Sequence, residues 1–287
     1  MRGDQGKIIA RNSTSPIVHA SGHRLATLIR GFRHSKEIQK TRLSQLFAGA
    51  TVVVHLAAVS FVGHGNAEEF YRVNVFGTLN LLEALAQLDP APRRIVIASS
   101  PNVYGTPPIE VLDETVCPRP VNHYANSKLA MENMVRTWFD RLPIVITRPF
   151  NYTGPGQADH FVIPKIVRHF RQRSPVIELG NLHVSRDFSD VEDVVAVYTA
   201  WLDSEVRSEI VNLCSGRGIA LLDVIQTMNQ LAGYQIEVRV NPDLVRSHEV
   251  PRQVGSNAKL RSLVRLPEPR PFSETLRRMY EAPASLT

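Results

Sequence analysis

The chain is poor in the features that mark secreted, membrane-spanning and metal-binding proteins. Its 287 residues include only two cysteines, Cys117 and Cys214, which cannot build a disulfide framework, so a cytoplasmic location is expected. No apolar run approaches the roughly 20 residues that span a bilayer, and the first six residues lack the apolar core of a signal peptide. The ten histidines show no ligand spacing, so no metal is expected.

The excess of basic residues comes without a nucleic-acid-binding motif. The net charge is +6, but the basic residues are spread along the chain from Arg2 to Arg278 and no recognisable module accompanies them. We therefore expect no nucleic-acid or membrane partner. A solvated basic surface is one interpretation, and two or three arginines that meet an anionic small molecule are the other.

Short apolar runs alternate with longer helical patterns. Strands are predicted at 23–29, 51–56, 94–99 and 144–147, with helices at 68–88 and 124–139 between them. This alternation predicts an α/β fold with a Rossmann-like, doubly wound parallel sheet covered on both faces. Beyond Asn151 the pattern changes, with a helix predicted at 161–173 and a strand at 176–179. A helix at 190–202 and a strand at 210–213 are predicted to return to the main sheet, and a helix at 219–232 and a strand at 235–240 suggest a smaller C-terminal lobe.

Polar motifs follow three of the predicted strands. They are His55-Leu-Ala-Ala58, Ser99-Ser100 and Arg148-Pro-Phe-Asn151. In parallel α/β sheets ligands bind at the carboxyl ends of the strands, so function should lie there. Ser100 lacks the Gly-x-Ser-x-Gly elbow of a hydrolase nucleophile.

Tyr124 and Lys128 are the most informative pair of residues. They are four apart on a predicted helix and therefore share one face. A cation beside a phenol favours phenolate and lowers a pKa that starts near ~10, which makes the phenol usable as an acid or base near neutral pH. The pair suits proton transfer to or from an alcohol or sugar oxygen during hydride transfer.

These motifs, with Val73-Asn-Val-Phe-Gly-Thr78 and Val103-Tyr-Gly105, resemble those of the extended short-chain dehydrogenase/reductase family of NAD-dependent epimerases and dehydratases. The resemblance runs from about Gly22 to the end of the chain. It is strongest to GDP-4-keto-6-deoxy-mannose reductases and GDP-mannose 4,6-dehydratases. The segments that carry it are Arg148-Pro-Phe-Asn-Tyr-Thr-Gly-Pro-Gly-Gln157, Phe161-Val-Ile-Pro164, Ser185-Arg-Asp-Phe-Ser-Asp190 and Pro251-Arg-Gln-Val-Gly255.

The resemblance implies catalytic roles for three residues. Tyr124 would donate a proton to a C4 carbonyl, Lys128 would assist Tyr124 and contact the nicotinamide ribose, and Ser100 would steady the reacting oxygen. Dehydratases of the family carry acidic residues between this serine and Val-Tyr-Gly. Here Pro101 and Asn102 stand there, and neither is a general acid or base, so dehydration is not expected.

The resemblance also implies an NADP or NAD cofactor. Besides Tyr124 and Lys128, the implied contacts are Leu56, Ala57, Ala58, Asn74 and Pro149. Asn74 would also order the active-site helix, although a buried helix asparagine is an equally good interpretation.

The N-terminal segment departs from the family. The family's first strand and its Gly-x-x-Gly-x-x-Gly loop let a pyrophosphate approach a helix N-terminus. Here only Gly3 and Gly6 could correspond, as a remnant or by coincidence, and Ile9 stands where a third glycine would fall. A sheet without that strand would lack a central member. Arg30 ends the next strand and could pair with a 2′-phosphate, which favours NADP; an exposed strand-end arginine is the alternative.

The substrate implied by the resemblance is a nucleotide sugar. Asn151, Arg186 and Arg246 would contact its diphosphate, and Val162 and Lys165 would line the nucleotide site. The predicted domains are a dinucleotide-binding domain at 1–153, to which 190–213 returns, and a substrate lobe at 154–189 and 214–287.

Three functions follow from these observations. The first is reduction of a GDP-4-keto-6-deoxy sugar at C4, and the second is 4-epimerisation of a nucleotide sugar. The third, suggested by the N-terminal departure, is a non-catalytic or truncated dinucleotide-fold protein with impaired cofactor binding. By analogy with the family, the helices from Glu68 and from Tyr124 would form a homodimer surface.

Overall fold

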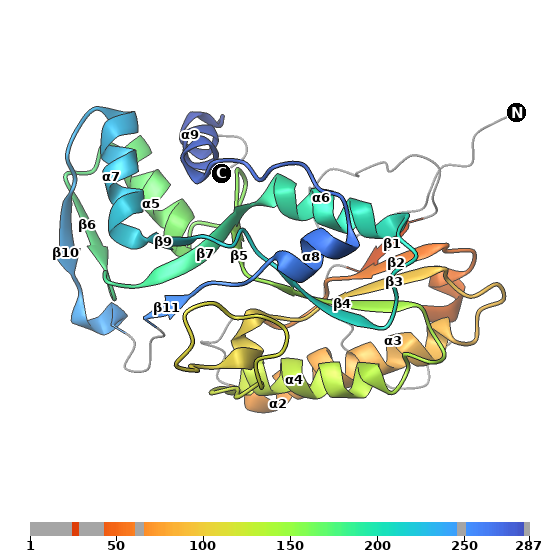
Figure 1. Cartoon of the computed structure of the whole chain (residues 1–287). Coiled ribbons are helices and arrows are strands. Elements are labelled where there is room, and N and C mark those ends of the chain that lie inside the picture. The colour runs from red at the N-terminus through yellow and green to blue at the C-terminus, as the bar shows by residue number, and fades with distance from the viewer. Residues whose placement is uncertain (1–24, 29–42, 61–65, 246–250, 284–287) are drawn as a thin grey trace, which may run out of the picture. The chain divides into compact units, whose positions relative to one another are not determined.

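The computed structural model describes residues 25–28, 43–60, 66–245 and 251–283, and these fall into two compact units. Unit 1 contains the described residues up to Pro107 together with Glu114–Arg148 and Tyr198–Val211. Unit 2 contains Pro108–Asp113, Pro149–Val197 and the described residues from Asn212 onward. The elements of both units are labelled in Figure 1.

A five-stranded sheet with the order β1-β2-β3-β4-β8 forms the centre of unit 1. Its strands are β1 (Leu25–Leu28), β2 (Val52–His55), β3 (Arg94–Ala98), β4 (Ile144–Pro149) and β8 (Glu209–Leu213). The first four pair in parallel. β1 pairs directly with β2, so the described strands form one continuous sheet. The segment in which the family's first strand would be expected lies outside the described residues. A parallel, Rossmann-like α/β fold is confirmed.

Apolar side chains cover both faces of this sheet, because alternate residues of a strand point to opposite sides. On one face, Val53, Ile95 and Ile144 pack against a helix at 43–47, α3 (Thr78–Leu85) and α4 (His123–Arg136). On the other face, Val52 and Val54 pack against the C-terminal end of α6 (Val191–Leu202). β2 is therefore buried on both faces, as its valine run predicts.

The helix predicted at 68–88 is three consecutive segments. They are α2 (Ala67–Tyr71), a π-helical segment η1 (Arg72–Gly77) and α3. Asn66 begins α2, since its side chain accepts a hydrogen bond from the backbone N–H of Glu68 at 3.1 Å. A π segment widens the helix by one residue per turn and often marks a functional position. Apolar periodicity alone did not reveal it.

Unit 2 holds two small sheets and a helical layer. One sheet has the order β11-β7-β5, with β9 paired to β7, and the other pairs β10 with β6. The strands are β5 (Asn151–Thr153), β6 (Val176–Leu179), β7 (Ser185–Asp190), β9 (Gly218–Ala220), β10 (Glu237–Val240) and β11 (Arg252–Gln253). The helices are α5 (Val162–Arg171), α7 (Leu221–Ala232), α8 (Ala258–Leu263), α9 (Phe272–Glu281) and the short η3 (Pro242–Leu244).

The core of unit 2 lies between α5, α7 and α9. Buried members include Phe170, Met228 and Leu276, one from each of the three helices. Each predicted strand and helix agrees with an observed one to within about three residues at either end. The elements that were not predicted include the helix at 43–47, β5, β7, β9, β11, α8 and α9.

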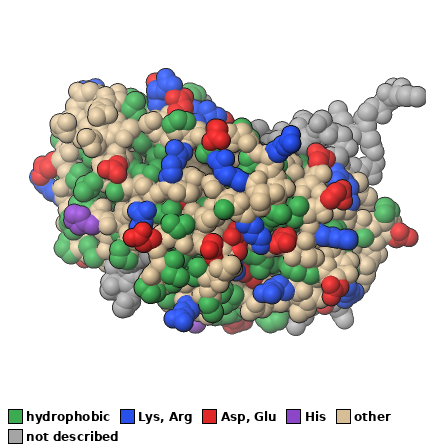
Figure 2. All heavy atoms as spheres, viewed as in Figure 1, with side chains coloured by type: hydrophobic (Ala, Val, Ile, Leu, Met, Phe, Trp, Pro, Cys, Tyr) green, Lys and Arg blue, Asp and Glu red, His purple; other side chains and the backbone are tan. Residues whose placement is uncertain are grey.

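The surface mixes charges of both signs. On the face drawn in Figure 2, basic and acidic side chains are interspersed among apolar and polar ones.

Within the described ranges, the helices are all too short or too polar to cross a bilayer.

Gly105 occupies a backbone position that a side chain would not fit. It follows the turn η2 (Pro101–Tyr104) with a φ of 67°, and a Cβ atom there would lie 1.9 Å from the carbonyl oxygen of Arg119. We predict that Gly105→Ala lowers the free energy of unfolding by about 2–4 kcal/mol, since it adds a backbone clash to an unfavourable φ. Urea unfolding monitored by circular dichroism measures the loss.

Gly233 provides the matched control. Its φ is 72°, but a Cβ atom there would meet nothing within 4 Å. Gly233→Ala should therefore cost only about 1–2 kcal/mol, from backbone strain alone. Equal losses in the two variants would contradict the role assigned to the Arg119 contact.

Candidate active site

Ser100 lies at the end of β3, where it begins the turn η2. Its backbone is extended, and its Oγ accepts a hydrogen bond from the backbone N–H of Asn102 at 3.2 Å. Pro101 occupies the first position of the turn, where proline needs no N–H partner. The serine is buried, and the cap fixes where its hydroxyl lies.

Tyr124 and Lys128 lie one turn apart on α4. Asn122 begins this helix by accepting a hydrogen bond from the backbone N–H of Ala125 at 2.9 Å. The Tyr124 ring is buried and packs against Phe70, with 6.1 Å between ring centroids. The helix therefore presents both residues on its buried side.

Lys128 joins α4 to the sheet. Its Nζ donates a hydrogen bond to the carbonyl oxygen of Ala98 at 2.8 Å, two residues before Ser100. Burial lowers the pKa of Lys128 to about 8, while the Glu132 carboxylate acts in the opposite direction. At neutral pH the ammonium therefore keeps its proton and can donate further hydrogen bonds.

Glu132 continues the same helix face and forms a buried ion pair with Arg148 of β4. The Arg148 Nε and Nη2 atoms lie 2.9 and 2.6 Å from the two carboxylate oxygens. The guanidinium also stacks over the Tyr104 ring, 4.7 Å from its centroid. Sequence analysis missed this pair, although the spacing of four between Lys128 and Glu132 was a usable signal.

Asn74 ties the π-helical segment to two other elements. Its Oδ1 accepts from the backbone N–H of Val59 at 2.9 Å, and its Nδ2 donates to the carbonyl oxygen of Val59 at 3.1 Å and to Ser127 Oγ at 2.9 Å. Ser127 precedes Lys128 on α4. Asn74 thus holds the segment after β2 and the helix of the Tyr124 pair in place.

Buried polar atoms with no partner occur at the ends of β2 and β3. Among the described residues, His55 Nδ1 and Ser99 Oγ are buried and make no hydrogen bond. The other ring nitrogen of His55 lies 3.0 Å from Thr78 Oγ1. Beyond β2, Leu56 is exposed, and Ala57 and Ala58 are half-buried and small. This edge of the sheet has the unpaired polar groups and the low bulk that a polar ligand requires.

In unit 2, Asp187 gathers two loops around one carboxylate. Its oxygens accept from Ser215 N at 2.8 Å, Ser215 Oγ at 2.7 Å, Gly216 N at 2.9 Å and Gly255 N at 3.3 Å. Burial raises the pKa of Asp187, and these hydrogen bonds act against that rise. The predicted residue Asn151 donates from Nδ2 to the Asp187 carbonyl oxygen at 3.2 Å. No spacing in the sequence pointed to Asp187.

The other predicted residues of unit 2 are dispersed over separate elements. Arg186 lies on β7, half-buried, and donates from Nη1 to the carbonyl oxygen of Ser185 at 2.9 Å. Lys165 of α5 donates to the carbonyl oxygen of Glu178 at 2.6 Å, and Val162 begins the same helix. Pro149 ends β4. The predicted residues Gly3, Gly6, Arg30 and Arg246 lie outside the described residues.

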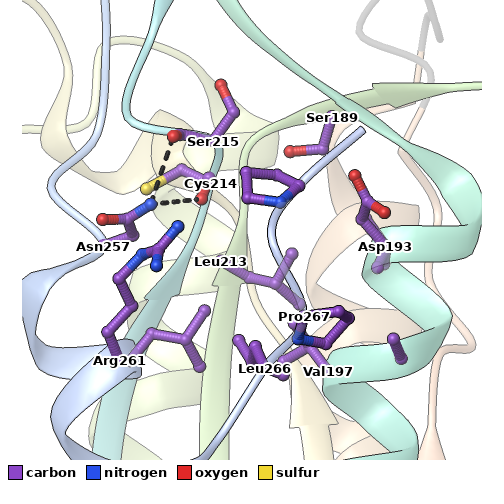
Figure 3. A pocket seen from close by; sticks show the side chains of 14 residues that line it. Ser189, Asp193, Val197, Leu213, Cys214, Ser215, Asn257, Arg261, Leu266 and Pro267 are labelled. Atoms are coloured by element: carbon purple, nitrogen blue, oxygen red, sulfur yellow. Dashed lines mark hydrogen bonds between the residues drawn. The ribbon is translucent and has the colours of Figure 1, made fainter. Parts of the chain in front are cut away.

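A small cavity in unit 2 does not coincide with any predicted residue. It measures about 40 Å³ and is lined mainly by aliphatic side chains, with Arg261 and Asp193 on opposite sides in Figure 3. Asn257 Nδ2 donates to the carbonyl oxygens of Ser215 and Cys214 at 3.1 and 3.4 Å. The cavity has room for a water-sized molecule, not for a nucleotide.

Across the described ranges, no cluster of three His, Cys, Asp or Glu residues could hold a metal.

A family model described as GDP-mannose 4,6 dehydratase matches residues 19–279. The chain is 36% identical over 208 residues to GDP-6-deoxy-D-talose 4-dehydrogenase of Aggregatibacter actinomycetemcomitans, covering 72% of this chain and 71% of that one. It is 34% identical over 219 residues to GDP-6-deoxy-D-mannose reductase of Pseudomonas aeruginosa, covering 72% of each chain. The solved structure of RMD from Pseudomonas aeruginosa complexed with NADPH superposes with a TM-score of 0.78 at 29% identity, covering 87% of this chain and 86% of that one.

His55 should make stability depend on pH. Burial, and secondly the Lys128 charge, lowers the pKa of His55 to about 3, against about 6.5 in an unfolded chain. Between these values the unfolded state binds a proton that the folded state excludes, so stability falls as pH falls. We predict that wild type loses about 2 kcal/mol more unfolding free energy than His55→Gln between pH 7 and pH 5.

Urea unfolding at several pH values measures this difference. The exposed His183 is the control position, and His183→Gln should follow the wild-type pH dependence. If His55→Gln and His183→Gln behave alike, His55 is not the buried neutral base described above.

Proposed function

The chain belongs to the GDP-mannose 4,6-dehydratase family, and we propose that it is an NAD(P)-dependent oxidoreductase that reduces a GDP-linked 4-keto-6-deoxy sugar at C4. The observation that carries this proposal is the joining of Tyr124 and Lys128 of α4 to the Ser100 end of β3 through the Lys128–Ala98 hydrogen bond. The names of the relatives, a dehydrogenase and a reductase of GDP-6-deoxy sugars, support the same substrate class.

The residues at the edge of the sheet fit a dinucleotide. Unpaired polar atoms of His55 and Ser99, small side chains at Ala57 and Ala58 and the Lys128 ammonium meet where parallel strands end. When bound, the reduced nicotinamide supplies a hydride to the C4 carbon. NADPH is the proposed form, because Arg30 suits a 2′-phosphate and the related RMD structure contains NADPH.

Tyr124 supplies the proton that completes the reduction. The phenol donates to the carbonyl oxygen as negative charge develops there, which turns the ketone into an alcohol. Lys128, protonated at neutral pH, places a cation beside the phenol and offers hydrogen bonds to ribose hydroxyls. Ser100 holds the same oxygen by a hydrogen bond, which steadies it in the transition state.

The sequence after Ser100 argues against dehydration. Elimination of water needs an acid or base near the sugar, whereas this turn offers Pro101 and Asn102. The chain therefore shares its family with dehydratases, but the residues of the turn favour reduction over elimination of water. A 4-epimerase would return the hydride to the substrate and leave the cofactor unchanged, so net NADPH consumption separates the two reactions.

Unit 2 is proposed to bind the nucleotide sugar. Asn151 and Arg186 lie on the paired strands β5 and β7, near the loops that Asp187 fixes. An arginine and an amide are suited to diphosphate oxygens. Arg246, Val162 and Lys165 complete the proposed substrate residues, and unit 1 is proposed to hold the cofactor.

A cytoplasmic homodimer is proposed as the working form. Its surface would comprise α2, η1 and α4, which pack on one another within unit 1. Phe76 of η1 is 54% exposed, so its ring is available to pack against a partner subunit. The sparse cysteines fit a reducing compartment.

The proposed function is tested with Tyr124→Phe, which removes only the phenol hydroxyl. We predict that wild type oxidises NADPH in the presence of a GDP-4-keto-6-deoxy sugar and that Tyr124→Phe lowers kcat about 10²- to 10⁴-fold, because the proton donor is lost. NADPH affinity, measured by fluorescence, should change little. Tyr71→Phe is the control, since the Tyr71 hydroxyl contacts His123 at 3.3 Å outside the proposed site. Wild type that consumes no NADPH would refute the proposal.

The dimer is tested by placing a charge at Phe76. We predict that wild type shows twice the chain mass of 32.1 kDa in light scattering and that Phe76→Glu shifts it toward the monomer. Burying a carboxylate in an apolar interface is costly. Leu222→Glu, at an exposed position of α7 in unit 2, should leave the mass unchanged. A monomeric wild type would contradict the proposal.

A further inference from the structure

We propose that Glu132 and Arg148 are positioning residues for the reaction: their buried ion pair holds the helix face of Tyr124 and Lys128 in place against the turn that begins at Ser100. The inference rests on the proposed function. It adds two residues that do not touch the substrate but act through those that do.

The pair is built for rigidity. Both Arg148–Glu132 contacts are made by a fork of two nitrogens to two oxygens, at 2.9 and 2.6 Å. The side chains are 5% and 1% exposed. A bidentate geometry fixes direction as well as distance, which a single point charge does not.

Three elements meet at this pair. Glu132 belongs to α4, Arg148 to β4, and the Tyr104 ring under the guanidinium to the turn η2. The turn begins at Ser100, so the arginine contacts the far end of the segment whose first residue holds the reacting oxygen. Moving Arg148 would therefore disturb α4 and the serine turn together.

The helix face has two anchors one turn apart. Tyr124, Lys128 and Glu132 follow one another at spacings of four and so lie on one side of α4. Lys128 is fixed to Ala98 of β3, and Glu132 is fixed to Arg148 of the neighbouring strand β4. With both anchors present, α4 cannot roll or slide without breaking a buried polar contact.

The pair also sets the charge around Lys128. Glu132 on α4 and His55 on β2 interact electrostatically with Lys128, and Tyr124 lies one turn before it on the same helix. Arg148 on β4 reaches Lys128 only through Glu132, and its guanidinium lies over the Tyr104 ring of η2. Glu132 raises the pKa of Lys128 against the effect of burial. Its replacement by glutamine should make Lys128 lose its proton at lower pH.

Replacing Arg148 by an uncharged residue should shift the pKa of Lys128 in the opposite direction, to a higher value. Without Arg148 the Glu132 carboxylate is free to pair with Lys128, which then keeps its proton to higher pH. If the pair had a purely structural role, both variants would lose stability, and the pKa of Lys128 would not shift in opposite directions in the two. The sign of each shift therefore separates positioning from packing.

The first measurement needs neither substrate nor cofactor. The chain has six lysines, so full-length protein carrying ¹³Cε-lysine gives few NMR signals, and Lys128→Arg identifies the one of interest. The Lys128 signal is titrated in wild type, Glu132→Gln and Arg148→Met. We expect the midpoint to move to lower pH in Glu132→Gln and to higher pH in Arg148→Met.

Arg94→Met is the matched control. Arg94 is also a buried arginine of the same sheet, but it lies at the other end of β3 and donates to the Val206 carbonyl oxygen. Its loss should lower stability without moving the Lys128 titration or lowering kcat. If Arg148→Met does not fold, Arg148→Gln, which also removes the charge, takes its place in the titration. Arg148→Lys is used in the kinetics, because lysine keeps the charge but cannot form the fork or the ring stack.

The second measurement is steady-state kinetics with NADPH and the GDP-4-keto-6-deoxy sugar. We expect Glu132→Gln and Arg148→Lys to lower kcat roughly 10- to 100-fold, with KM values changed less than about threefold, since misplacement of reacting groups lowers kcat more than binding. In the kcat–pH profile, the fall in kcat at alkaline pH should begin at a lower pH in Glu132→Gln than in wild type.

The two measurements distinguish the possible failures. An inactive wild type whose variants show the expected Lys128 shifts refutes the proposed function and supports the pair's control of Lys128. An unchanged Lys128 titration in Glu132→Gln and Arg148→Met overturns the proposal whatever the activity. Shifted titrations with wild-type kcat in both variants also overturn it, because the pair would then not serve the reaction.

Discussion

The hydrogen bond from Lys128 Nζ to the Ala98 carbonyl oxygen is the contact on which the arrangement of Tyr124 and Ser100 depends. It joins the helix of the Tyr124 pair to the strand that ends at Ser100, and it is made by a charged donor in a buried place. Such a donor is costly to bury unless it is paired, so the bond constrains where α4 can lie on the sheet. Burial also brings the pKa of Lys128 to about 8, which leaves the group charged but near its titration range at neutral pH.

The surrounding polar network supports this contact from two sides. Asn74, in the π-helical segment, bonds both to Val59 after β2 and to Ser127 beside Lys128. Glu132 bonds to Arg148 on the far side of the lysine. Removing one partner of a buried ion pair typically costs about 3–5 kcal/mol, because the other charge is left unpaired. The Glu132–Arg148 pair therefore constrains both of the elements that it joins, α4 and β4.

Buried polar groups are organised differently in the two units. In unit 1 the polar groups follow the ends of parallel strands, which is where an α/β sheet offers free backbone and space. In unit 2 one carboxylate, Asp187, receives hydrogen bonds from the Ser215–Gly216 turn and from Gly255, and its backbone receives the Asn151 amide. A buried carboxylate of this kind orders several loops at once, because each loop contributes a backbone donor that would otherwise be unsatisfied.

The sequence by itself determined the parallel α/β fold, the family and the Tyr124–Lys128 pair, because periodicity and short-range spacing are local properties that a helix or strand transmits directly. Only the tertiary structure decided which buried charges meet. The Glu132–Arg148 pair joins residues 16 positions apart in sequence, and the Asp187–Gly255 bond joins residues 68 apart. The π-helical turn around Asn74 was likewise hidden, since its wider winding is specified by the contacts it makes. Such pairings arise when separate elements pack together and remove the same polar groups from water. No local pattern in the sequence encodes them.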